Sequence, residues 1–583
     1  MKKILSSFVC LWVLLLGNGL AEAGAAEVQP LTFDHNYTFS EVVDYLDKII
    51  KAYPDITRLY KIGESYEGRD LLVLEISNQK NKNPLDKPGF WLDGSLHSSE
   101  VMGAAVCLKT IETLVTQYEK DEKITQLVNT RTIYVMPKLN PDGSELYLTT
   151  PFSLRSSVRP HDSDGDGALD EDPPEDLNGD GYITSMRIKD GKGTMKTHPE
   201  DSRLMERREE NEKGEWRVFS EGVDNDKDGR YNEDGVGGLD INRNWPSRWQ
   251  QEYIQRGAGP YPLSEPETRA VAEFLFDHPN VTGLINHHMA GNFLYRPPSN
   301  LWVDPVTGKK MEIPPQDERI YQTFGDKYSE ILYAQPVRKV MGRRGPPSYG
   351  AIFGVMIGWA YDHLGIFSWV PEMGSLEPFC DYDDNGRVTD LEQMRWNEEE
   401  MDGRIFKDWE SYDHPELGKV EIGGFVRKLY NPQYESYTNI LCTPGPKYRE
   451  YLEKHTCWNL YLIRMSPLVK LTEVQTENLE AGFVRITASV RNMGFLPTNV
   501  TQHAVKNETA KPVKVFLSLN GAELVGGKKE QELGHLSGNT PRSVSPVKNL
   551  EWVVRKTRES EASFEIKVVS EKGGTVKRKV SLD

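Results

Sequence analysis

A change of hydrophobic pattern near residue 466 divides the chain into two parts and limits the folds open to each. From about residue 30 to 465, strand-like runs such as "LLVLEIS", "TIYVMPKL" and "GIFSWVPEM" alternate with helical runs such as "SEVVDYLDKIIKAYP" and "EPETRAVAEFLFDHP". This alternation predicts an α/β domain with a mixed β-sheet flanked by helices. After residue 466, "GFVRITASVRNMG" and "VKVFLSLNG" alternate apolar and polar residues. We therefore predict that residues 466–583 form an all-β sandwich, an accessory domain.

The composition favours globular domains and argues against two classes of partner. The chain has 583 residues, of which 38% are hydrophobic, so it has ample apolar surface for packed cores and is long enough for more than one domain. Its formal net charge is -18. Because nucleic acids and anionic membranes are bound by clustered Lys and Arg, this charge argues against both and favours cation binding.

The chain begins with a segment that resembles a targeting signal. Residues 1–26, within "MKKILSSFVCLWVLLLGNGLAEAGAAEV", combine a Lys pair, a short apolar core and small residues. This pattern is typical of a secretory signal peptide and predicts a secreted or periplasmic protein. No later run is long and apolar enough to predict a membrane span. Four cysteines lie outside this segment, and their spacing is not that of a disulfide framework. They are Cys107, Cys380, Cys442 and Cys457.

The stretch "GSLHSSEVMG", residues 94–103, lies between a strand-like run and a helical run. It has two interpretations. His97 and Glu100 are placed so that both are able to bind one metal ion at the turn. Alternatively, the stretch is an ordinary helix start, with Ser98 or Ser99 as the cap and Glu100 favoured by the helix dipole.

A histidine pair, His287 and His288 in "LINHHMAGNFLYRP", follows another strand-like run. Ligands of α/β folds gather at the carboxyl ends of the strands, so we expect these histidines and His97 at one edge of the sheet. Two histidines and a carboxylate, with a fourth position left open, are the usual ligands of a catalytic zinc ion. The alternative for each histidine is a structural, hydrogen-bonded role at a strand end.

Five motifs then occur in a fixed order along residues 32–460. After the opening "TFSEVVDYLDKIIKAYPDITRLYKIGESYEGRDLLVLEIS" come "HSSE", "LNPDG", "DINRNW", the strand with the two histidines and "GWAYDHLGIFSWVPEMG". In this order they resemble the zinc metallocarboxypeptidases of the carboxypeptidase A type, in the form of a bacterial-like secreted member with an Asp-rich insertion and a C-terminal β-sandwich. The resemblance implies a catalytic domain over residues 30–465.

The resemblance also implies a metal site and a general base. The zinc ligands would be His97, Glu100 and His288, because "HMAGNFLYRP" reproduces the family's spacing from the ligand His to Gly and Arg-Pro. His287 remains the alternative ligand. Glu372, in "SWVPEMG", matches the family's general base, a carboxylate that takes a proton from water and delivers it to the leaving amine.

Further positions match the family's substrate-binding residues. Asn242 and Arg243 in "DINRNW" would anchor the terminal carboxylate of a peptide, since a guanidinium pairs with a carboxylate through two hydrogen bonds. Arg155 would polarise the scissile carbonyl and stabilise its oxyanion. Tyr349 would cover the substrate. Ile357 lies where the family reads the released side chain, which favours apolar or aromatic termini.

Four Asp-rich runs depart from the familiar family pattern. Asp at alternate positions followed by Gly is the front half of a calcium loop. Three such runs lie in an insertion of about residues 160–238 and lack a carboxylate at position 12, whereas the fourth, "DYDDNGRVTDLE", is complete. The predicted calcium ligands are Asp162, Asp164, Asp166, Asp176, Asn178, Asp180, Asp224, Asp226, Asp228, Asp381, Asp383, Asn385, Arg387 through its backbone carbonyl, and Glu392.

We expect the insertion to lack an apolar core of its own, so that bound ions would fold it over the rim of the active site. The alternative is an acidic, solvated loop.

The sequence thus favours a zinc-dependent carboxypeptidase that acts on peptides or proteins with a free C-terminus, with calcium as a second ion. Two alternatives remain. One is a related zinc amidohydrolase that acts on cell-wall peptides or acylated amino acids. The other is an inactive relative that binds peptides.

Overall fold

The computed structural model describes most of the chain. The described residues are 28–297, 313–332, 352–442, 446–540, 546–558 and 561–582. The predicted signal peptide and Tyr349 lie outside them. No helix among the described residues is long and apolar enough to cross a membrane.

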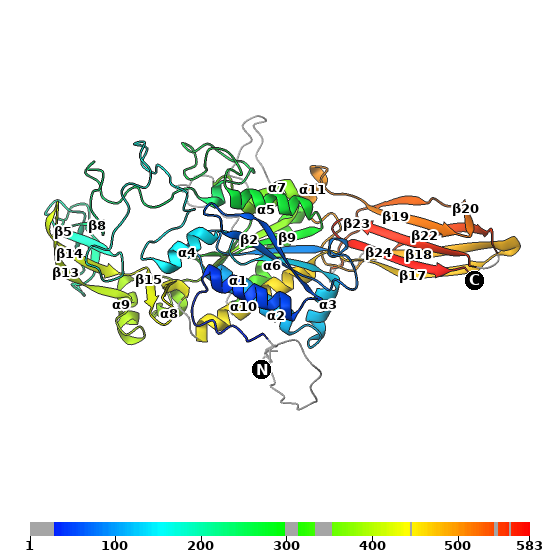
Figure 1. Cartoon of the computed structure of the whole chain (residues 1–583), viewed down its shortest axis with the longest axis horizontal. Helices are drawn as coiled ribbons and strands as arrows, with labels where there is room; N and C mark the ends of the chain where they lie inside the picture. Colours follow the sequence, from blue (N-terminus) through cyan, green and yellow to red (C-terminus); the bar gives the residue numbers. More distant parts are fainter. Residues whose placement is uncertain are drawn as a thin grey trace, which may run out of the picture.

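A mixed eight-stranded sheet forms the centre of the molecule (Figure 1). The strand order is β1-β2-β4-β3-β9-β12-β10, and β11 pairs with β12. The strands from β4 to β10 run parallel, whereas β1, β2 and β4 pair antiparallel. Their bounds are β1 Thr57–Glu64, β2 Asp70–Ile76, β3 Gly89–Asp93, β4 Thr132–Met136, β9 Val281–Asn286, β10 His288–Met289, β11 Phe293–Tyr295 and β12 Phe367–Met373.

Helices cover both faces of this sheet, because the central strands are apolar on both sides. One face packs against α1 (Phe39–Ala52), α2 (Met102–Thr116), α3 (Glu122–Thr130), α6 (Pro315–Leu332) and α10 (Pro446–Met465). The other packs against α5 (Pro266–Asp277) and α7 (Met356–Leu364). The shorter helices are α4 (Pro141–Thr149), α8 (Glu377–Cys380), α9 (Asp390–Glu399) and α11 (Gln502–Lys506). The predicted mixed sheet flanked by helices is confirmed.

The C-terminal part consists of two four-stranded antiparallel sheets that share one apolar core. The strict alternation of buried and partly buried residues in β23 is typical of a strand in such a sandwich. The strands are β17 Val469–Asn478, β18 Phe483–Asn492, β19 Val513–Asn520, β20 Ala522–Gly526, β21 Glu530–Gly534, β22 Lys548–Lys556, β23 Ser563–Ser570 and β24 Gly574–Ser581. This strand-rich fold agrees with the predicted all-β class.

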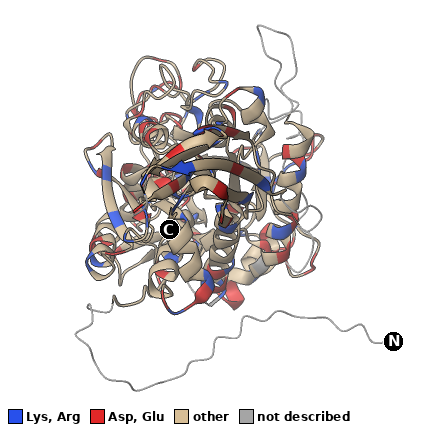
Figure 2. Cartoon of the chain, turned by 90° about the vertical axis from the view of Figure 1, so that its right-hand side faces the viewer, with Lys and Arg blue, Asp and Glu red and all other residues tan. Residues whose placement is uncertain are grey.

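The sandwich contacts the amino ends of the parallel strands. Lys572 donates a hydrogen bond to the backbone oxygen of Val281, the first residue of β9, at 2.8 Å. Arg131 donates to the backbone oxygen of Ser466 at 3.0 Å, and the hydroxyls of Thr282 and Ser466 lie 2.8 Å apart. Viewed from this end, acidic and basic residues are interspersed (Figure 2). The sandwich therefore packs opposite the edge at which the strands end.

The insertion differs from the expectation, because its middle part folds as a sheet. A six-stranded sheet with the order β13-β14-β5-β8-β6-β7 combines insertion strands with two later strands. Met186 from the insertion packs against Val420 and Ile422 in a small apolar core. The insertion thus has no core of its own, but the later strands β13 and β14 supply the apolar surface that it lacks, a contribution that the sequence did not reveal. The strands are β5 Ser185–Lys189, β6 Met195–Thr197, β7 Met205–Arg207, β8 Trp216–Ser220, β13 Phe406–His414 and β14 Gly418–Phe425, followed by the hairpin β15 Lys428–Asn431 and β16 Ser436–Asn439.

Candidate metal centre and active site

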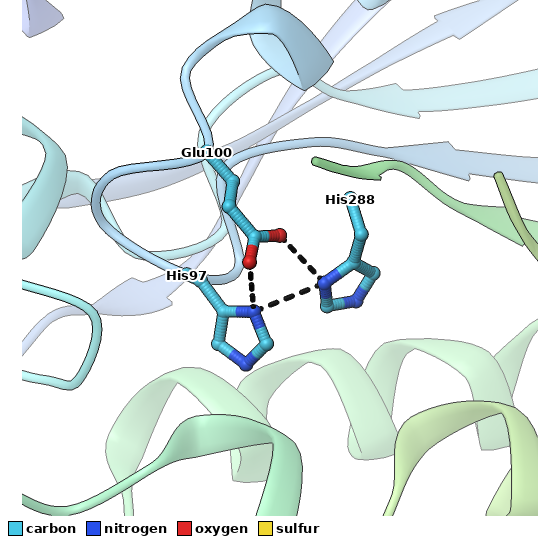
Figure 3. Close-up of side chains that lie close together, drawn as sticks. All are labelled: His97, Glu100 and His288. Carbon is cyan, nitrogen blue, oxygen red and sulfur yellow. Dashed lines mark hydrogen bonds and ion pairs between the residues drawn. The ribbon is translucent and has the colours of Figure 1, made fainter. Parts of the chain in front are cut away.

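Three buried side chains meet at the carboxyl edge of the central sheet (Figure 3). His97 and Glu100 lie on the turn between β3 and α2, and His288 lies in β10, directly after β9. The two Nδ1 atoms are 3.0 Å apart. Glu100 Oε1 lies 2.8 Å from Nδ1 of His97, and Oε2 lies 2.7 Å from Nδ1 of His288.

The other ring nitrogen of each histidine also lies beside an oxygen atom. Nε2 of His97 lies 3.1 Å from Oδ1 of Asp240, and Nε2 of His288 contacts Oδ1 of Asn286. With a metal ion bound at the two Nδ1 atoms, these oxygens would accept the Nε2 protons, and each Nδ1 would present its lone pair to the metal. The two Nδ1 atoms and the Glu100 carboxylate point at one spot.

This donor set fits zinc. Two Zn–N bonds at a tetrahedral angle hold the nitrogens about 3.3 Å apart, close to the observed separation. Acceptors that orient ligand histidines through the remote nitrogen are typical of zinc sites. Burial raises the pKa of Glu100, but His97 and His288 outweigh it and hold that pKa well below its usual range. Glu100 is therefore an ionised carboxylate.

The alternative interpretation of "HSSE" as an ordinary helix start is wrong. Helix α2 begins at Met102, and its N-cap residue Val101 makes no side-chain capping hydrogen bond. Ser98 instead donates to the backbone oxygen of Ser156 at 2.6 Å. The serine ties the turn to the segment that carries Arg155.

His287 lies apart from the cluster. Its Nδ1 is 2.7 Å from the backbone oxygen of Asp93, and its Nε2 is 3.2 Å from Oδ1 of Asn459 on α10. Burial lowers its pKa to about 4. In this position it is a neutral, hydrogen-bonded core residue.

Glu372 lies beside the cluster on the neighbouring strand. In the parallel pairing of β10 and β12, its Cα is the register partner of His288. Burial and then the negative charge of Glu100 raise its pKa well above the usual range, although Arg155 acts in the opposite direction. A carboxyl group at this position is able to exchange protons with a molecule bound at the cluster.

The predicted substrate residues from "DINRNW" and Arg155 also meet here. Arg155, with a side chain 52% exposed, lies 3.1 Å from Oε1 of Glu100 and 3.3 Å from Oδ2 of Asp240. Nδ2 of Asn242 lies 3.4 Å from Nε2 of His288. Arg243 donates to the backbone oxygen of Asn242 at 2.8 Å. Two guanidinium groups and an amide thus border the cluster.

Sequence reasoning missed Asp240 and Asn286, the two acceptors that orient the histidines. Asp240 is buried and also lies 3.8 Å from Arg243. Burial raises its pKa, but Arg243 and His97 hold that pKa well below its usual range. Both residues lie within two positions of a predicted site residue, and this proximity was the available signal.

The structure describes Ile357, whereas Tyr349 lies outside the described residues. Ile357 lies in α7, is 6% exposed, and belongs to the apolar cluster that contains Trp245 and Trp359. Its backbone oxygen accepts a hydrogen bond from Ser368.

The four Asp-rich runs adopt one loop geometry. In each, the first Asp accepts the backbone N–H of the Gly at position 6, for example Asp381 from Gly386 at 2.8 Å and Asp224 from Gly229 at 2.9 Å. In the fourth loop, both oxygens of Glu392 accept hydrogen bonds, from Tyr382 and from Thr389. This geometry is compatible with calcium loops and also with acidic turns.

A cluster of two His and one Glu is one of the ligand sets of catalytic zinc in metal-dependent hydrolases, and here it lies at the carboxyl edge of a helix-flanked mixed sheet. The family profile described as zinc carboxypeptidase matches residues 42–380, so this chain belongs to the zinc carboxypeptidase family. A second profile, described as a domain of unknown function, matches residues 468–581.

Several named relatives are similar to parts of the chain. Carboxypeptidase D of Anas platyrhynchos is 40% identical over 118 residues, which are 20% of this chain and 8% of that protein. Carboxypeptidase A5 of Homo sapiens is 23% identical over 337 residues, 57% of this chain and 58% of that protein. The matched segments thus span less than two thirds of these relatives.

Among solved structures, thrombin activatable fibrinolysis inhibitor matches with a TM-score of 0.39 and 20% identity, over 59% of this chain and 69% of that one. Carboxypeptidase A from Helicoverpa armigera matches with a TM-score of 0.37 and 18% identity, over 59% and 66% of the two chains.

Proposed function

We propose that this chain is an active zinc-dependent carboxypeptidase that releases C-terminal residues from peptides or proteins. The observation that carries the proposal is the convergence of two histidine ring nitrogens and one carboxylate beside Glu372. Family membership supports zinc as the metal. An inactive relative would have no need for the base beside the cluster.

His97, Glu100 and His288 would hold the metal, and zinc bound there would supply a Lewis acid for a carbonyl and a water molecule. Glu372 would accept a proton on its carboxylate and deliver it to the nitrogen of the leaving amine. Arg155, exposed beside Glu100, would donate hydrogen bonds to the oxygen that gains negative charge. Asp240 would keep His97 oriented through the donation from its Nε2.

Arg243 and Asn242 would bind the terminal carboxylate of the substrate. The Arg243 side chain is only 16% exposed, so it offers a partly desolvated cation on the rim of the cluster. Ile357 would contribute to an apolar boundary of the pocket for the released side chain. Tyr349 would cover the bound peptide.

Two further parts of the proposal concern calcium and location. Calcium would bind in the Asp-rich loops, which is supported by their shared turn geometry and by the completeness of the 381–392 loop. The amino-terminal pattern supports export, to the periplasm or outside the cell.

A peptide mixture incubated with the zinc-loaded protein tests the activity. We expect mass spectrometry to detect loss of single residues from free C-termini. Cleavage of acylated amino acids or cell-wall peptides alone would instead favour the amidohydrolase. Binding without cleavage would favour an inactive relative.

A further inference from the structure

The first and third Asp-rich loops, residues 162–172 and 224–234, form the two ends of the insertion. The first follows Arg155 closely in the sequence, and the third precedes Asp240 closely. In Figure 1 the insertion lies at the end of the molecule away from the sandwich. Along the chain, each loop thus lies between the strands of the insertion sheet and a segment that carries an active-site residue, Arg155 or Asp240.

The loops contact each other through their position-11 residues. Asp172 and Asp234 form an isolated antiparallel bridge, in which the N–H of Asp172 donates to the backbone oxygen of Asp234 at 3.1 Å. The carboxylate of Asp172 crosses to the third loop and accepts from the N–H groups of Asn225 and Asn232, at 2.9 and 2.6 Å. Each oxygen of the Asp172 carboxylate thus accepts a hydrogen bond.

Carboxylates of the two loops are interleaved in a symmetric way. Asp164 lies with Asp228 and Glu233, and Asp226 lies with Asp166 and Glu171. In each set, one ligand atom per residue lies within 4.8 Å of the others. Each set joins position 3 of one loop to position 5 and position 10 of the other.

Asp234 is the counterpart of Asp172, but its environment is different. It is 0% exposed, and neither of its carboxylate oxygens has a hydrogen-bond partner among the described residues. One of these oxygens lies within 4.8 Å of ligand atoms of Asp164 and Glu171. Glu171 and Glu233 likewise bury unpartnered oxygens. A buried carboxylate without a partner is strongly unfavourable unless it takes up a proton or a cation compensates its charge.

The nearby guanidinium does not supply that compensation. Arg230 approaches Asp164 at 3.5 Å and Asp228 at 3.4 Å, with a side chain that is 64% exposed. An ion pair this exposed contributes little. One exposed guanidinium therefore leaves an excess of negative charge among the carboxylates of the paired loops.

We propose that the paired loops form a calcium clasp, in which Asp164, Glu171 and Asp234, together with the interleaved carboxylates, bind divalent cations across the two loops and hold the Arg155 and Asp240 segments together. All donors are oxygens, which hard cations prefer, and carboxylates on flexible loops suit the six to eight ligands of calcium better than the strict octahedron of magnesium. The clasp includes Glu171, Glu233 and Asp234, which were not among the calcium ligands predicted from each loop separately.

The clasp is connected to the site by short hydrogen-bonded steps. Asp170 of the first loop accepts the N–H of Gly237, which follows the third loop, at 3.0 Å. Ser157 donates its N–H to the backbone oxygen of Leu239 at 2.9 Å. Arg155 and Asp240 then form the ion pair beside His97. Cation binding would thus position Arg155 and Asp240. The effect of this positioning on catalysis rests on the proposed function, whereas the positioning itself does not.

The test uses the full chain with zinc content verified by metal analysis, before and after calcium is removed on a chelating resin. Calcium added back should raise the melting temperature of the wild type by about 5 °C at saturation, whereas magnesium should have little effect. Asp234→Asn keeps the volume of the side chain and removes its charge. It should melt above the wild type without calcium, because repulsion is relieved, and below it with calcium, because a ligand is lost.

Glu210→Gln, which removes an exposed charge elsewhere in the insertion, is the matched control and should respond to calcium like the wild type. If the proposed peptidase activity holds, calcium removal should lower kcat/KM by about 10- to 100-fold, since displacements near 1 Å at an active site have effects of this size.

Three results would overturn the clasp: no effect of calcium on melting, an equal effect of magnesium, or the same calcium response in Asp234→Asn and the wild type. A different result would contradict the proposed function and leave the clasp intact. In that case the zinc-loaded protein cleaves no peptide, but Asp234→Asn still melts above the wild type without calcium and below it with calcium.

Discussion

The Asp-rich insertion and the C-terminal sandwich are additions at opposite ends of one sheet, and they are stabilised in opposite ways. The sandwich packs on the amino ends of the parallel strands and has a continuous apolar core. The insertion approaches the carboxyl ends, has only a small apolar core, and concentrates carboxylates in its loops.

This difference separates stability from catalysis. The free energy gained by burying apolar surface is roughly proportional to the buried area and does not require ions. The sandwich is therefore expected to stabilise the fold whether or not ions are present. Crowded carboxylates depend on the cations that bind them, so the insertion is able to respond to its surroundings. Changes at the carboxyl edge should therefore affect turnover, and changes at the amino edge should affect stability alone.

The largest effect is expected at the carboxyl edge, from Glu372→Gln. Loss of a general base should lower kcat by about 100- to 10,000-fold while zinc stays bound, because the side chain is not one of the three converging ligands. His97→Ala should lose zinc and activity together. Metal analysis and peptide kinetics on both variants decide the matter, and substantial turnover by Glu372→Gln would contradict its assignment as the base.

At the opposite end, Trp552→Ala should destabilise the sandwich without changing the chemistry. Trp552 is 1% exposed in the core, and its indole N–H donates to the backbone oxygen of Lys528. We expect a loss of about 3–5 kcal/mol in unfolding free energy. Calorimetry should register this loss while kcat/KM, measured below the transition, stays at the wild-type value.

Val525→Ala is the control for this change, because Val525 is 55% exposed and its truncation should cost no more than about 0.5 kcal/mol. A fall in kcat/KM for Trp552→Ala at a temperature where the variant is folded would show that the two ends are coupled.

A change in the substrate should sharpen the assignment of the carboxyl edge. If Arg243 and Asn242 bind the terminal carboxylate, an amidated peptide leaves a partly buried guanidinium unpaired. The loss should be about 2–5 kcal/mol, or tens- to thousands-fold in kcat/KM. Peptides ending in Phe, Leu, Lys and Glu, as free acids and amides, provide the comparison. Equal rates for acid and amide would refute this anchor, and fast release of Lys would refute the apolar pocket at Ile357.

The smallest effect concerns the contact between the sandwich and the sheet. Burial lowers the pKa of Lys572 to about 8, whereas an unfolded Lys has a pKa of about 10.4. Between these values the unfolded chain binds more protons than the folded one, so this group makes stability rise with pH from about 8 to 10.4, by at most about 3 kcal/mol.

Melting curves between pH 7 and 10.5 measure this contribution. Lys572→Met should flatten the rise relative to the wild type, and Lys529→Met, at an exposed site in the same domain, should not. Parallel pH profiles for Lys572→Met and the wild type would contradict the assigned titration.

Both fold classes follow from the sequence, because periodicity is a local property. The apolar runs of the central strands and the strict alternation in β23 reflect burial on two faces and on one face, respectively. The turn with His97 and Glu100 was identifiable as a candidate from the same local pattern, although its two interpretations could not be separated there.

The choice between the histidines needed three dimensions. His287 and His288 are adjacent, and one Nδ1 faces the backbone oxygen of Asp93 while the other faces Glu100. Neighbouring positions on an extended chain point in different directions, but no local pattern says which direction leads to the metal cluster.

The sequence by itself therefore determined the two fold classes, the order of the motifs and the types of residue available for chemistry. Only the tertiary structure decided that Asp240 orients His97, that the insertion pairs with strands β13 and β14, and that Asp234 is buried without a partner. Each of these facts depends on contacts between segments far apart in the chain, whereas helix and strand periods depend on neighbours a few residues away.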